Sequence, residues 1–241
     1  MVRQSSYTIA VLCLLLSVVT TSPAFGIAIS WTDWTAATLG TNGSASGTMT
    51  IGSTNVGVTY TGQVSAPTQT SGGINYWNPA TPYLSSYISN APGTTDIIAL
   101  TGTNQIGQVV NTITFDTPLV DPVMALVSLG QPWNNYVVNY RFDHPFDLLS
   151  SGQGYWGGNP SGSLMELSGN ILQGLEGHGA IKFLGEVTSI SWTADPYEYW
   201  HGFTVGAAEV APVPEPSTIL LLAGGFLAMG VAGIRRRNAR T

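Results

Sequence analysis

Apolar residues recur at every second position in many short runs between residues 27 and 211. In residues 56–60 and 138–142, for example, valine and aromatic side chains alternate with smaller or polar ones. This period of two is typical of half-buried β-strands, whereas residues 123–129 are apolar at nearly every position, as in a strand that is buried on both faces. Turn-forming residues separate the runs: Asn42-Gly43, Gly72-Gly73, Asp121-Pro122, Gly157-Gly158-Asn159-Pro160 and Asp195-Pro196.

Residues 27–211 show no sustained helical period, and residues that favour surface helices are scarce among them. A segment of this length suits one domain with a full core and is too short for two of ordinary size. The sequence therefore predicts an all-β fold: a single, jelly-roll-like β-sandwich over residues 27–211. We call this segment the ectodomain, for the reasons that the two chain ends supply.

The N-terminal residues have the features of a secretory signal peptide. Arg3 provides a positive charge, and residues 9–19 form an apolar segment. We expect cleavage after Gly26, where the small residues Ala24 and Gly26 occupy positions −3 and −1. Cleavage after Ala28 is the alternative. Cys13 lies in the middle of the apolar segment, which argues against lipidation, and its removal with residues 1–26 leaves a mature protein without cysteine. Disulfides, thiolate nucleophiles and cysteine-ligated zinc are thereby excluded.

The C-terminal residues 212–241 combine three features in a fixed order. Pro214-Glu215-Pro216 comes first, an apolar segment over residues 217–234 follows, and Arg235-Arg236-Arg237 ends it. Eighteen residues span roughly 27 Å as a helix, enough to cross a thin bilayer. The three arginines are expected to stop transfer and to remain in the cytoplasm. This segment predicts one transmembrane helix at the C-terminus.

This arrangement resembles the PEP-CTERM sorting signal of exported proteins from bacteria that make exopolysaccharide. The resemblance rests on Pro214, Glu215 and Pro216, the apolar helix and the arginine cluster. It implies that a membrane-embedded exosortase recognises the Pro-Glu-Pro motif and cuts near it. It also implies an inner-membrane-anchored precursor whose mature form reaches the cell surface or the extracellular matrix.

Charge is distributed unevenly along the chain. Five of the seven basic residues lie in the two end segments, so that residues 29–211 contain Arg141 and Lys182 against twelve acidic residues, a net charge of −10. Such a domain repels phosphate backbones and anionic lipid. Nucleic acid is therefore excluded as a partner of the ectodomain.

A long segment between residues 63 and 95 is rich in proline and small polar residues and contains four aromatic residues. These are Tyr76, Trp77, Tyr83 and Tyr87. Loops of this length are commonly functional or disordered, and disordered segments are poor in aromatic residues. The four rings are predicted to stack on sugar rings, with Trp77 and Tyr83 as the main contacts; the alternative is that they cap one open end of the sandwich.

Three further segments combine glycine, aromatic and charged residues. They are residues 151–158, 176–179 and 198–206, of which the last two contain His178 and His201; His144 lies in a fourth such segment, residues 142–147. This half of the chain is similar to ectodomains of other PEP-CTERM proteins, a resemblance that implies no activity.

Each histidine lies next to or near a carboxylate, which makes a divalent metal site conceivable. The candidate ligands are His144, His178, His201, Asp143 and Asp147, but their spacings match no helical zinc motif, and we expect no metal. Calcium is an alternative cofactor, because aspartates are expected at strand ends, although no EF-hand loop is present. Those aspartates are Asp116, Asp121, Asp143 and Asp147.

Hydrolysis of a glycoside would need two carboxylates facing each other across a cleft. Four glutamates could supply them, but their spacing in the sequence does not bring them together: Glu166, Glu176, Glu186 and Glu198. No nucleophile elbow, phosphate loop or dinucleotide fingerprint occurs. The sequence therefore predicts a non-enzymatic, exported surface or matrix protein associated with exopolysaccharide. The alternative is a carbohydrate-binding module or a glycoside-cleaving enzyme displayed by the same tail.

Overall fold

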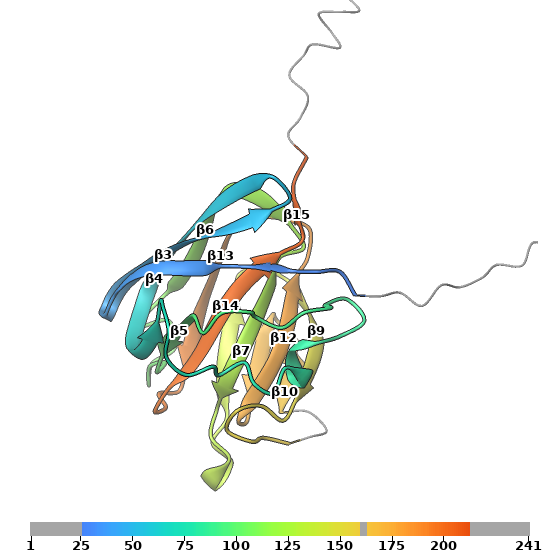
Figure 1. Cartoon of the computed structure of the whole chain (residues 1–241). Helices are drawn as coiled ribbons and strands as arrows, with labels where there is room; N and C mark the ends of the chain where they lie inside the picture. The colour runs from blue at the N-terminus through green and yellow to red at the C-terminus, as the bar shows by residue number, and fades with distance from the viewer. Residues whose placement is uncertain (1–25, 160–162, 213–241) are drawn as a thin grey trace, which may run out of the picture.

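A computed structural model describes residues 26–159 and 163–212, which fold almost entirely into β-strands (Figure 1). The first layer contains β2 (Asp33–Thr38), β3 (Gly40–Ile51), β4 (Thr54–Gln69), β6 (Asn111–Val120), β8 (Val138–Phe142), β10 (Leu164–Leu167), β11 (Ile171–Gly174), β13 (Glu186–Asp195) and β15 (Glu209–Val210). The second contains β1 (Ser30–Trp31), β5 (Ile97–Leu100), β7 (Val123–Leu129), β9 (Phe146–Gly152), β12 (Gly177–Phe183) and β14 (His201–Ala207). Two single-turn 3₁₀ helices, η1 (Thr81–Tyr83) and η2 (Trp133–Asn135), interrupt the loops. The all-β prediction is confirmed.

The two layers are joined through β4. Its residues Val58–Thr61 pair with β6 in the first layer, whereas Ser65 and Gln69 pair with β5 in the second. Between the two pairings lies Gly62, with a φ of 147°, where a Cβ would collide with the side chain of Asn111. Glycine is therefore required where this strand leaves one layer for the other. The resulting order is β10-β11-β8-β13-β6-β4-β5-β14-β7-β12-β9.

The two outer strands of this order, β9 and β10, meet through side chains. Glu166 Oε2 accepts a hydrogen bond from Leu148 N at 3.1 Å, and Ser151 Oγ accepts from Ser163 N and Leu164 N at 2.9 and 3.0 Å. The sheet is thus nearly closed and barrel-like, and two strand edges that could pair with another chain are covered.

Large aromatic side chains fill the space between the layers. Trp192 packs on Tyr60, Tyr140 and Phe203 with ring centroids 5.1 to 5.9 Å apart. These rings come from β13, β4, β8 and β14, so the core is contributed by both layers. Apolar residues at alternate positions of β4 and β8 point into it, as their period of two predicts.

The central strands β7 and β14 are buried at every position, because both of their faces are covered. Met124 and Leu126 of β7 face the main core, whereas Ala125 and Val127 pack against residues of the long segment 63–95. That segment lies over the outer face of the second layer as a cover (Figure 1).

One predicted turn is wrong. Asn42-Gly43 lies within β3, where the pairing with β4 shifts register between Gly40 and Gly43. Gly43 packs closely on the Thr38 carbonyl and on the Val64 side chain, so its missing Cβ permits a bulged strand at this point.

Among the described residues, none forms a helix of the length and apolarity that membrane crossing requires. The predicted signal peptide (residues 1–26, apart from Gly26) and the predicted transmembrane helix (residues 217–234) lie outside the described residues.

Candidate functional site: an aromatic pocket over a buried carboxylate

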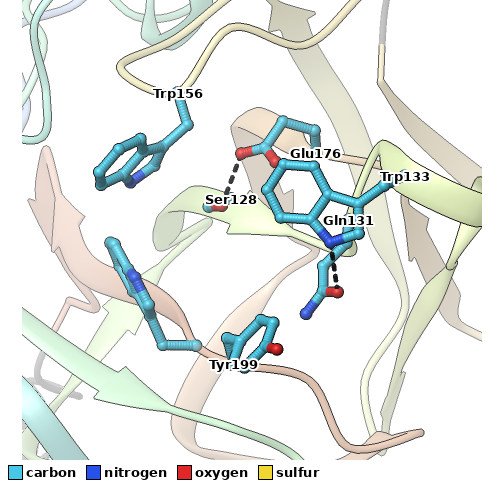
Figure 2. A pocket seen from close by; sticks show the side chains of 7 residues that line it. Ser128, Gln131, Trp133, Trp156, Glu176 and Tyr199 are labelled. Carbon is cyan, nitrogen blue, oxygen red and sulfur yellow. Dashed lines mark hydrogen bonds between the residues drawn. The ribbon is translucent and has the colours of Figure 1, made fainter.

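Loops at one end of β7, β9, β12 and β14 form a pocket with a volume of about 200 Å³ (Figure 2). Four segments contribute to it. One is the loop that follows β7, and the others belong to the segments that the sequence analysis singled out: residues 151–158, 176–179 and 198–206. The lining residues are Ser128, Gln131, Trp133, Trp156, Glu176, Tyr199 and Trp200.

Four aromatic side chains form the walls of the pocket, and three of them are largely exposed. The exposed fractions are 61% for Trp133, 52% for Trp156 and 74% for Tyr199. The rings of Trp156 and Trp200 are neighbours, with centroids 6.4 Å apart. Trp133 lies across the pocket from Trp156 (Figure 2). A cluster of exposed aromatic residues around a hollow is typical of a binding site.

Buried rings support the wall from behind. Tyr76 contacts both Trp200 and Tyr155, with ring centroids 5.0 and 5.1 Å apart. Burial, followed by the nearby Tyr155, raises the pKa of the Tyr76 phenol, so the phenol stays neutral. Tyr155 in turn packs edge-on against Trp156 at 5.0 Å. The long segment 63–95 therefore contributes to the pocket indirectly, by positioning Trp200.

The floor of the pocket contains a buried carboxylate. Glu176 is 4% exposed, and its Oε1 accepts a hydrogen bond from Ser128 Oγ at 2.6 Å. Glu176 and Ser128 have φ values of 54° and 59°, in the left-handed region that side chains rarely adopt. Such a conformation costs on the order of 1 kcal/mol or more per residue, and residues held this way cluster at functional sites.

His178 lies behind this carboxylate and is fully buried. Its Nδ1 accepts a hydrogen bond from Ser128 N at 3.4 Å. Its Nε2 lies 3.3 Å from Glu176 Oε1 without the alignment of a hydrogen bond. His178 thus packs against the carboxylate from the side away from the pocket walls.

A second buried pair, Glu198 and His201, links two segments of the pocket wall. Glu198 Oε1 accepts a hydrogen bond from Gly130 N at 2.9 Å and lies 2.5 Å from His201 Nδ1. Gly130 precedes the loop with Gln131 and Trp133, and Glu198 precedes Tyr199, so the pair ties two wall segments together. Tyr140 stacks edge-on against His201, and its pKa is raised, mainly by burial and to a smaller extent by Tyr60 and Glu198.

The aromatic residues predicted to stack on sugars do not present their faces to solvent. Trp77 and Tyr83 are 2% and 0% exposed and pack edge-on against each other, and burial raises the pKa of the Tyr83 phenol. Tyr76 is buried behind Trp200, and Tyr87 is half-buried beneath the ammonium group of Lys182. The direct sugar contact expected of Trp77 and Tyr83 is therefore corrected: both are core residues. They cover a sheet face and do not cap an open end.

The histidines and aspartates do not gather at one place. No group of three or more potential metal ligands occurs within residues 26–159 and 163–212. His144 Nδ1 lies 2.7 Å from Asp143 Oδ1 near the surface, whereas Asp121 and Asp147 lie 3.7 and 3.5 Å from Lys182 Nζ. Asp116 accepts from its neighbour Thr117.

The four glutamates considered for hydrolysis lie at different places and make different contacts. Glu176 lines the pocket and Glu198 ties its walls, whereas Glu166 closes the seam between β9 and β10 and Glu186 is exposed at the start of β13. Of the pocket's lining residues, Glu176 alone has a carboxylate.

The sequence did not identify Trp133, Trp156, Tyr199 and Trp200 as the pocket walls. A signal was present, because Trp156, Tyr199 and Trp200 lie in segments whose composition stands out, and Glu176 lies in a third. His178 and His201 of those segments are buried, whereas Trp156 and Tyr199 are exposed, so the rings and not the histidines mark the site.

Comparison with known proteins assigns the C-terminal segment. Residues 212–237 match the PEP-CTERM protein-sorting motif, and they include the Pro214-Glu215-Pro216 tripeptide and Arg235-Arg236-Arg237. Neither a curated protein nor a solved structure matches the chain. The chain therefore carries a PEP-CTERM sorting motif at its C-terminal end, which supports an exported precursor that is anchored in the membrane and processed by an exosortase for the cell surface.

Proposed function

We propose that the mature protein is a non-enzymatic carbohydrate-binding protein of the cell surface or extracellular matrix, with the aromatic pocket as its binding site. The observation that carries this proposal is the group of exposed indole and phenol rings around a polar floor. The associated polysaccharide is the exopolysaccharide that the sorting signal implies for the producing cell.

The pocket offers both kinds of contact that a sugar needs. The exposed rings of Trp133, Trp156 and Tyr199 provide apolar faces on which the C–H face of a pyranose can stack. Gln131 Oε1 accepts from Trp133 Nε1 at 3.0 Å, which fixes the amide with its nitrogen as the donor (Figure 2). Together with Glu176 it supplies a donor and an acceptor for hydroxyl groups.

The composition of the pocket favours binding over cleavage. A glycosidase of the usual type uses an acid and a second carboxylate on opposite sides of the scissile bond. Glu176 is the carboxylate among the lining residues, and its Oε1 is already engaged by Ser128. The exposed Trp133, Trp156 and Tyr199 surround it as a shallow aromatic enclosure that suits one or two sugar units.

A glycan array tests the proposal directly. The ectodomain, residues 27–211, is applied with and without a calcium chelator, next to its Trp156→Ala variant. We expect a defined set of glycans to bind the wild type in both conditions and the variant to lose them. Absence of binding to all glycans, or equal binding by the variant, would contradict a carbohydrate site at this pocket. Turnover of a bound oligosaccharide, detected by mass spectrometry, would contradict the non-enzymatic part of the proposal.

A further inference from the structure

Resting on the proposed carbohydrate site, we further propose that the pocket selects an amino sugar that has a free ammonium group over neutral and N-acetylated sugars. Three observations support this selectivity: the charge of the floor, the character of the walls and the distribution of cations in the domain.

No lysine or arginine of the described residues lies beside the carboxylate on the floor. Glu176 is buried beneath the pocket with Ser128 and His178 as its neighbours. A carboxylate buried without a lysine or arginine partner is unfavourable, and a ligand cation that reaches it removes this cost. An ammonium group can donate to the carboxylate in a charge-assisted hydrogen bond, which is stronger than one from a neutral hydroxyl.

The two cations of residues 29–211 are engaged elsewhere. Arg141 Nε lies 3.0 Å from Asp195 Oδ1 in a two-point pair on β8 and β13. Lys182 lies between Asp121 and Asp147 and above the ring of Tyr87. No basic side chain lines the pocket, and the net charge of −10 raises the local concentration of cations around the domain.

The walls favour a cation as well. The face of an indole ring attracts an ammonium group that lies within about 6 Å of its centroid. Trp133, Trp156 and Trp200 line the pocket together with Glu176, and Trp133 lies across it from Trp156 (Figure 2). A cation bound there meets aromatic rings and a carboxylate together. The same rings stack on the rest of the sugar. N-acetylation replaces the ammonium with a neutral amide and forfeits both electrostatic contributions.

The test compares three β-1,4-linked disaccharides that differ at one position: the disaccharides of glucosamine, of N-acetylglucosamine and of glucose. Full-length protein from a host without an exosortase is purified in a polyoxyethylene detergent, since maltoside headgroups are themselves sugars. Titration calorimetry is performed at about pH 6, where an ordinary amine is protonated. Disaccharides are used because a long cationic polymer would bind an acidic protein without specificity.

We expect the glucosamine disaccharide to bind about tenfold more tightly than the two neutral ones, a typical gain for a charge-assisted, aromatic-lined contact. Glu176→Gln keeps the shape and the acceptor for Ser128 and should abolish this preference. The matched control Glu186→Gln removes the same charge from the exposed start of β13 and should preserve it.

The other outcomes separate the two proposals. Equal affinity for all three disaccharides, unchanged in Glu176→Gln, overturns the amino-sugar selectivity and leaves carbohydrate binding intact. Absence of binding by all three, together with an empty glycan array, overturns both. Binding of tetramethylammonium as tight as that of the glucosamine disaccharide shows a site for small organic cations and overturns the selectivity for a sugar. A preference that Glu186→Gln also abolishes shows non-specific charge attraction and overturns it too.

Discussion

Trp77 and Trp156 provide a pair of substitutions that should separate stability from ligand binding. Trp77 is 2% exposed, its Nε1 donates to Asp96 O at 3.2 Å, and its ring meets Tyr83 at a centroid distance of 5.2 Å. Trp77→Ala removes a buried indole and leaves a cavity, which typically costs about 3–5 kcal/mol of the free energy of unfolding. In a domain of this size each kcal/mol lowers Tm by roughly 2–4 °C, so Tm should fall by on the order of 10 °C.

Trp156→Ala should have the opposite profile. The side chain is 52% exposed and touches Tyr155 and Trp200 at its edges. Losing these ring contacts costs about 1 kcal/mol, so Tm should change by only a few degrees. The wall of the pocket loses one stacking surface, and affinity for the best glycan should fall by about tenfold.

Both variants are measured by thermal unfolding monitored with circular dichroism and by calorimetric titration of the ligand well below the lower Tm. The Trp77 variant should retain the wild-type affinity once it is folded. A Trp77→Ala protein that keeps its Tm and loses binding would refute the assignment of this residue to the core. It would restore the direct sugar contact predicted from the sequence.

Three further predictions follow from other parts of the molecule. Burial raises the pKa of Asp96, outweighing the hydrogen bond that its carboxylate accepts from Trp34 N, so the folded state binds this proton more tightly than the unfolded state. The free energy of unfolding should therefore decline as pH rises from about 4 through the raised pKa of Asp96. Asp96→Asn keeps an oxygen acceptor and should flatten this part of a plot of Tm against pH. An unchanged slope would contradict the raised pKa of Asp96. Replacement of residues 214–216 by alanine should leave the precursor uncut and in the membrane fraction of an exosortase-containing host, whereas the wild type loses the mass of its tail on a blot; identical size and fractionation would refute sorting. Residues 27–211 expressed alone should give a far-ultraviolet spectrum of β-structure and the mass of a monomer in solution, and a helical spectrum would contradict the fold.

Features that depend on local pattern were predictable from the sequence. The alternation in residues 56–60 and 138–142 correctly places side chains in the core, because the strand period directs every second residue to one face. The continuous apolar run of residues 123–129 correctly predicts a strand that is buried on both faces. The sorting motif depends on consecutive residues and was likewise identified.

The candidate site was not predictable in the same way, because it depends on which loops meet. Residues 131–133, 156, 176 and 199–200 are separated by long stretches of sequence and are brought together only by the order β14-β7-β12-β9. The error on Trp77 and Tyr83 has a related cause. Because β7 is buried on both faces, another part of the chain must cover its outer face. The aromatic residues of the long segment 63–95 pack there.

The position of β14 has a consequence for the timing of folding during export. This strand is the last long one in the chain, ending at Ala207, yet it lies in the middle of the second layer and pairs with β5, β7 and β1. Until it is available, β1 has no partner strand among the described residues, and β5 and β7 each have a neighbour on one side only. Contacts so distant in sequence form slowly. The sorting motif begins at residue 212, only five residues further on. The domain can thus close only when nearly all of it has left the translocation channel, at about the moment when the tail reaches the bilayer. Completion of the second layer and membrane anchoring are then expected to coincide.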